Sequence, residues 1–173
     1  MSQENVLVNR VANSGLITIN LEEYYPKQDI VTFDIKDYLW KEMILKEKDF
    51  RLALKEYDWS PYENKIVCVI CSTDAIIPVW SYMLVSSLVA KHGGIPYGVD
   101  QETFLSIHYR GVIDKMDVNE YEGKRIVVKG CSDKAVPPSA YLDIQMKLTG
   151  VAQSVMYGEP CSTVPIYKQP RKL

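Results

Sequence analysis

An internal repeat is the feature that most constrains how this chain folds. Residues 58–72 return, with one single-residue gap, as residues 117–132. The similarity continues to Pro-Tyr-Gly at 96–98 over Met-Tyr-Gly at 156–158, and the offset stays at 59 or 60 residues throughout. Because a sequence repeat indicates one supersecondary unit used twice, the structure of one copy predicts that of the other.

Each copy has the pattern of a β-α-β unit. A short β-branched run ends at a cysteine, a Ser-containing loop leads to a proline, and an apolar helical segment ends near glycine. Proline is typical of the first turn of a helix, and glycine is typical of a position just past its end. The expected strand, helix and return strand are residues 66–70, 79–91 and 95–99 in the first copy and 126–129, 139–148 and 153–157 in the second.

These patterns predict an α/β fold with a mainly parallel sheet and helices on both faces. The sheet is built from two βαβ repeats with right-handed crossovers, and both copies are expected in one sheet. A helix over residues 101–116 joins them. Residues 16–21 and 30–35 alternate like strands and predict an N-terminal strand or hairpin, and residues 38–57 have the spacing of a long helix.

The length favours one domain, because 173 residues exceed the usual size of a single core only slightly, at roughly 150 residues per domain. We expect one domain over residues 1–173, with residues 1–57 packed on the repeat. The repeat copies occupy residues 58–98 and 117–158, and residues 159–173 form a C-terminal tail.

Composition excludes several classes of function. Twenty basic and 22 acidic residues give a net charge of −2 without long runs of one sign, which argues against a nucleic-acid or membrane-surface partner. The sequence shows neither a signal peptide nor a membrane-spanning run, so we expect a cytoplasmic protein. Thiols are kept reduced there, and disulfides between its four cysteines are not expected.

Three of the four cysteines share one local pattern, in which serine follows directly and proline comes a few residues later. They are Cys71, Cys131 and Cys161. Ligands of open α/β sheets bind at the carboxyl ends of parallel strands, where these turns are expected. We therefore predict that the three sulfur atoms converge at one edge of the sheet.

Converging thiolates repel one another unless a cation lies between them, which indicates a thiophilic metal or an iron–sulfur cluster. Zinc, iron and an iron–sulfur cluster are the candidate cofactors. The fourth ligand is open among Asp74, Asp133, Glu159 and Cys68, with solvent or a partner's ligand as the alternative. Ser72, Ser132 and Ser162, with Asp133 and Glu159, are the residues expected to surround the sulfur atoms.

Two other interpretations stay open. One of the cysteines acts as the nucleophile of a thiol enzyme or sulfur carrier, because helix N-termini beside Cys71 and Cys131 would favour a thiolate. Alternatively, all cysteines are inert in a structural or interaction protein. Cys68 lies inside a strand and is expected in the core, while His92 and His108 are expected at a helix end and in packing. Common nucleotide-binding, hydrolase and metalloprotease motifs are missing from the sequence.

The strings at residues 8–19, 33–37, 47–51, 129–132 and 158–168 resemble a bacterial family known as domain of unknown function 2480. The resemblance covers nearly the whole chain and implies an uncharacterised protein of the Bacteroidetes type, loosely associated with iron–sulfur assembly genes. It implies no catalytic residue. Together with the cysteine pattern, it leads us to expect an accessory factor in metal-centre assembly, with other assembly proteins as partners.

Overall fold

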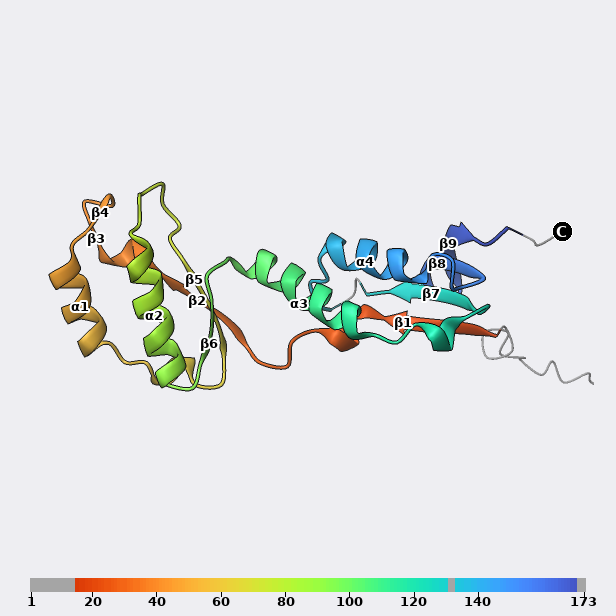
Figure 1. Cartoon of the computed structure of the whole chain (residues 1–173), viewed down its shortest axis with the longest axis horizontal. Coiled ribbons are helices and arrows are strands. Elements are labelled where there is room, and N and C mark those ends of the chain that lie inside the picture. Colours follow the sequence, from red (N-terminus) through yellow and green to blue (C-terminus); the bar gives the residue numbers. More distant parts are fainter. Residues whose placement is uncertain (1–14, 131–132, 171–173) are drawn as a thin grey trace, which may run out of the picture. The chain divides into compact units, whose positions relative to one another are not determined.

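The computed structural model describes residues 15–130 and 133–170 (Figure 1). The chain divides into two compact units, and each is described by itself. Unit 1 comprises residues 1–25 and 108–173, and unit 2 comprises residues 26–107. Unit 2 is therefore inserted into the sequence of unit 1, and the long helix α3 (Gln101–Lys115) begins in one unit and ends in the other.

Unit 2 contains a parallel sheet of β2 (Ile30–Asp34), β5 (Ile66–Ile70) and β6 (Ile95–Tyr97), in that order. Four of the five residues of β5 are buried, as expected for a central parallel strand, and Ile66 pairs with both Ile30 and Ile95. The remaining elements are η2 (Ile35–Tyr38), β3 (Leu39–Trp40), β4 (Ile44–Leu45), α1 (Glu47–Glu56), η3 (Ser60–Tyr62) and α2 (Val79–Lys91).

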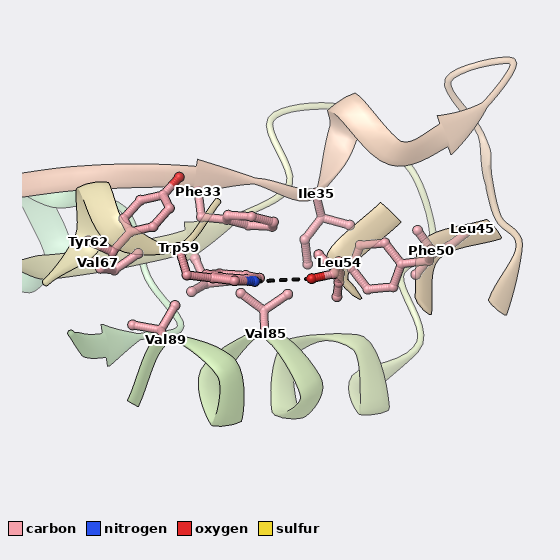
Figure 2. Close-up of a cluster of buried hydrophobic side chains, with 11 residues drawn as sticks. Phe33, Ile35, Leu45, Phe50, Leu54, Trp59, Tyr62, Val67, Val85 and Val89 are labelled. Atoms are coloured by element: carbon pink, nitrogen blue, oxygen red, sulfur yellow. Dashed lines mark hydrogen bonds between the residues drawn. The ribbon is translucent and has the colours of Figure 1, made fainter. Parts of the chain in front are cut away.

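The core of unit 2 forms where α1 and α2 pack against one face of this sheet (Figure 2). Trp59 lies at its centre, with its ring stacked on Phe33 at 5.5 Å between centroids. The indole Nε1 donates a 3.0 Å hydrogen bond to the Leu54 carbonyl, which meets the polar requirement of a buried tryptophan. The buried cluster comprises Phe33, Ile35, Leu45, Phe50, Leu54, Trp59, Tyr62, Val67, Val69, Val85 and Val89.

Unit 1 contains a sheet in the order β1-β7-β8-β9, in which β1 (Leu16–Asn20), β7 (Arg125–Lys129) and β8 (Ser154–Glu159) run parallel. The last strand, β9 (Ser162–Lys168), returns antiparallel beside β8. Its other elements are η1 (Leu21–Tyr24), η4 (Asn119–Tyr121), α4 (Pro138–Leu148) and the later part of α3.

Helices α3 and α4 of unit 1 are joined by polar side chains as well as by core packing. The Tyr109 hydroxyl on α3 donates to the Leu21 carbonyl at 3.0 Å, and its ring is fully buried. Lys147 on α4 donates to the carbonyls of Ile113, Asp114 and Met116 at 2.8–2.9 Å. These are carbonyls that the end of a helix leaves without intrahelical partners, so Lys147 caps α3.

The α/β class and the parallel pairing are confirmed, but the expectation of one sheet is wrong. Strand β5 lies in the sheet of unit 2 and β7 lies in the sheet of unit 1. The two N-terminal strands do not form a hairpin with each other, because β1 pairs with β7 and β2 pairs with β5. An apolar run identifies a strand without identifying its partner, which is why the sequence pattern did not separate the sheets.

Two further expectations differ from the structure. The helix predicted over residues 38–57 begins only at Glu47, after the short hairpin of β3 and β4. Its turn places Lys41 and Glu42 at φ of 51° and 58°, a left-handed conformation that a right-handed helix cannot include. The predicted tail contains strand β9. Among the described residues, no helix has the length and apolar character needed to cross a membrane.

Candidate functional site

The cysteines that the sequence predicted to converge are distributed over both units. Cys71 directly follows β5 and belongs to unit 2, while Cys161 lies in the turn between β8 and β9 of unit 1. Cys131 and Ser132 lie outside the described residues. Both described thiols are at the carboxyl ends of parallel strands, the edge where α/β sheets bind ligands. Their convergence on one site stays a prediction.

The carboxyl edge of the unit 2 sheet holds Cys71 in a hydrogen-bonded loop. The half-buried Cys71 Sγ donates to the Thr73 carbonyl at 3.7 Å. Asp34, at the end of β2, accepts the backbone N–H groups of Ser72 and Lys36, each at 3.0 Å. Burial alone would raise the pKa of Asp34, but hydrogen bonds from Ser72 and Lys36 outweigh it and hold that pKa below its usual value.

This arrangement does not favour a reactive thiolate at Cys71. The Ser72 amide, the adjacent backbone donor, is taken by the Asp34 carboxylate. Burial raises the pKa of the Tyr82 hydroxyl, and the nearby Cys71 and Asp34 raise it further, which places all three groups in one neighbourhood. A carboxylate beside a thiol opposes its ionisation, because two negative charges then lie close together.

The carboxyl edge of the unit 1 sheet brings the ends of two strands together. Lys129, the last residue of β7, forms an ion pair of 3.1 Å with Glu159, the last residue of β8. The Asp133 backbone N–H donates to Glu22 Oε1 at 3.1 Å, and the Tyr141 hydroxyl donates to the Gly130 carbonyl. The exposed Cys161 is two residues beyond Glu159, so its turn lies beside the end of β7.

The other residues predicted for the site have separate positions. Cys68 is fully buried and burial raises the pKa of its thiol, which confirms it as a core residue. Asp74 is exposed in the loop before α2, and Ser162 begins β9. Within residues 15–130 and 133–170, no group of three or more His, Cys, Asp or Glu side chains is placed to hold a metal.

The two histidines have structural contacts. His92 is the C-terminal cap of α2, and its Nδ1 lies 2.8 Å from the Leu88 carbonyl. His108 Nε2 lies 2.8 Å from the Tyr24 carbonyl in unit 1. Both roles, at a helix end and in packing, agree with the sequence analysis.

Two hollows in unit 2 were not predicted from the sequence. The first, which we call the β6 hollow, has a volume of about 220 Å³ and lies between α2 and β6. The second has about 460 Å³ and lies between the β3–β4 hairpin and the loop before α2. The β6 hollow is lined by Val69, Tyr82, Met83, Ser86, Pro96, Tyr97 and Gly98, and the second by Met43, Ile44, Leu45, Asp74, Ala75, Ile76 and Pro78.

A sequence signal for the β6 hollow exists at its glycine. The repeat alignment placed Gly98 over Gly158, whereas the strand registers place it over Tyr157. A glycine that corresponds to a large aromatic residue leaves space unless another side chain fills it. The one-residue ambiguity of the alignment hid this difference.

Comparison with known proteins gives one result. Neither the curated proteins nor the solved structures contain a match for this chain. One family model matches residues 5–169, which is nearly the whole sequence and includes both units. This chain therefore belongs to the family described as Protein of unknown function (DUF2480).

Proposed function

We propose that this protein binds a thiophilic metal ion or an iron–sulfur species through Cys71, Cys131 and Cys161, as an accessory factor in metal-centre assembly. The observation that carries the proposal is the Lys129–Glu159 ion pair. It holds the turn that contains Cys161 beside the end of β7, the strand that leads towards Cys131 in the sequence. A reducing cytoplasm is the compartment in which these thiols would remain available.

The described residues do not complete a ligand set by themselves, so the proposal depends on Cys131. Zinc sites formed by thiolates usually have four ligands. In unit 1, Cys161 and Cys131 are the proposed thiolates, with Glu159 and Asp133 as nearby carboxylates. Cys71 is the proposed third thiolate from unit 2. Other metal-centre assembly proteins are the proposed partners, either as donors or as acceptors of the metal species.

Metal analysis of protein purified without oxygen tests this function. We expect stoichiometric metal in the wild type, with an absorption band in the visible range if an iron–sulfur cluster is bound. The variants Cys71→Ser, Cys131→Ser and Cys161→Ser should each lose most of it, because each removes one ligand. Cys68→Ala is the matched control, since it removes a thiol from the core and should retain the metal.

The outcomes separate the alternatives. Loss of metal in Cys131→Ser and Cys161→Ser but not in Cys71→Ser would confine the site to unit 1 and overturn the shared three-cysteine site. Absence of metal in the wild type, with one serine variant alone abolishing alkylation by iodoacetamide near pH 7, would replace it with a nucleophilic thiol. Absence of metal with no selective alkylation would leave the structural interpretation.

A further inference from the structure

The strand registers of the two units give a residue-by-residue correspondence. Ile66 begins β5 and pairs with Ile95, while Arg125 begins β7 and pairs with Ser154. Both pairs differ by 59 residues, and the same offset relates other buried residues at equivalent places in the two units. These pairs are Phe50 and Tyr109, Tyr62 and Tyr121, Val85 and Ile144, and Val89 and Leu148.

This correspondence places Gly98 of unit 2 opposite Tyr157 of unit 1. In unit 1, the Tyr157 ring contacts the Tyr141 ring edge to face, at 5.7 Å between centroids and 80° between planes. Tyr82 corresponds to Tyr141 by the same offset and lines the β6 hollow together with Gly98. The β6 hollow therefore occupies the position that an aromatic ring fills in unit 1.

The geometry at Gly98 is consistent with an open position for a ring. A Cβ added to Gly98 would meet no atom within 4 Å among the neighbouring residues, and its backbone is not left-handed. The volume of about 220 Å³ is below that of a typical site for a drug-sized ligand, about 300–1,000 Å³, and suits one side chain. Met83 on its rim is 69% exposed, and a flexible thioether makes favourable contacts with aromatic rings.

We propose that the β6 hollow is a docking site for one aromatic side chain, tyrosine or phenylalanine, of a partner polypeptide. The occupant is inferred from unit 1, where the ring in this position is supplied by a polypeptide strand and lies against Tyr141. In unit 2 the partner's ring lies edge to face against Tyr82 and covers Met83. This inference is independent of the metal site, because none of the proposed ligands lines the hollow.

The test uses the full chain with methyl-labelled methionine and N-acetyl-tyrosinamide as the probe. We expect a saturable ring-current shift of the Met83 methyl signal in the wild type, and no comparable shift with N-acetyl-leucinamide. Gly98→Tyr should weaken the binding at least about tenfold, because its own ring fills the hollow. Gly111→Tyr is the matched control: Gly111 lies on an exposed position of α3 with open space around it, and binding should be unchanged.

The reciprocal variant extends the test to unit 1. Tyr157→Gly should open an equivalent hollow beside Tyr141 and add a second, weaker site for the same probe. If that variant does not fold, Gly98→Leu still tests the hollow by filling it without an aromatic ring. An unmoved Met83 signal, or equal binding in Gly98→Tyr, would overturn the proposal. A shift with p-cresol but not with N-acetyl-tyrosinamide would also overturn it, in favour of a small phenol.

Discussion

The two units meet the same structural requirement with different chemistry at the ends of α1 and α3. In unit 2, the Leu54 carbonyl accepts a 3.0 Å hydrogen bond from the buried indole of Trp59. In unit 1, the corresponding Ile113 carbonyl accepts a 2.8 Å hydrogen bond from the ammonium group of Lys147. The requirement comes from the backbone, since a helix end leaves carbonyls without partners. The donor is therefore free to differ between the units.

A second difference concerns the outer strand of each parallel set. In unit 1, β9 pairs with β8, and Tyr157 occupies the space beside α4. In the described part of unit 2, β6 is the outer strand of its sheet, and Gly98 leaves the β6 hollow beside α2. The same arrangement is thus filled by the chain itself in one unit and open in the other. This difference identifies a functional surface that neither unit shows by itself.

The largest expected effect tests whether the units are separate in stability. Phe50 is 1% exposed in the core of unit 2, so Phe50→Ala should destabilise that unit by about 3–5 kcal/mol. Amide hydrogen exchange should then increase in β2 and β5 much more than in β7 and β8. Leu52→Ala is the control on the same helix, because Leu52 is 58% exposed and its loss should cost less than about 0.5 kcal/mol. Equal loss of protection in both sheets would show one cooperative unit.

A smaller effect sharpens the comparison of the helix ends. Lys147→Met keeps the packing of the aliphatic stem but removes the donor to three carbonyls of α3, and should cost about 1.5 kcal/mol in urea unfolding. Lys115→Met, at an exposed position near the same helix end, should cost less than about 0.5 kcal/mol. Equal effects of the two substitutions would mean that Lys147 does not stabilise the end of α3.

The smallest effect concerns the ends of β1 and β2, where Asn20 and Asp34 accept equivalent backbone hydrogen bonds. Because the pKa of Asp34 is lowered on folding, its contribution to stability is present above its unfolded pKa of about 4 and is lost as pH falls through the folded pKa. Asp34→Asn should change stability at pH 7 by a few tenths of a kcal/mol, as expected between similar capping residues. It should also reduce the loss of stability between pH 5 and pH 3, measured by urea unfolding. An unchanged acid dependence would contradict this account of Asp34.

Much of the local structure follows from the sequence, but the pairing of distant segments does not. The apolar run at 66–70 and the proline-to-glycine span at 79–91 predicted β5 and α2 at their observed bounds. The edge position of Cys71 followed from the strand that precedes it. The division into two sheets depended on which strand β1 and β2 chose, and periodicity carries no information about that choice.

The candidate site was predictable to a similar extent. A cysteine at a strand end can be recognised from residue order, and Cys68 was correctly assigned to the core. The Lys129–Glu159 ion pair required knowledge that β7 and β8 are neighbours and end together. The β6 hollow required the strand register, because a shift of one residue places Gly98 over a glycine and not over a tyrosine.

The crystal structure of the full-length Gly98→Tyr variant tests the correspondence between the units most directly. We predict that the introduced ring fills the β6 hollow and lies edge to face against Tyr82, with a centroid separation close to the 5.7 Å between Tyr141 and Tyr157. A ring that points into solvent, with the hollow beside Tyr82 still open, would contradict the correspondence and the docking site inferred from it.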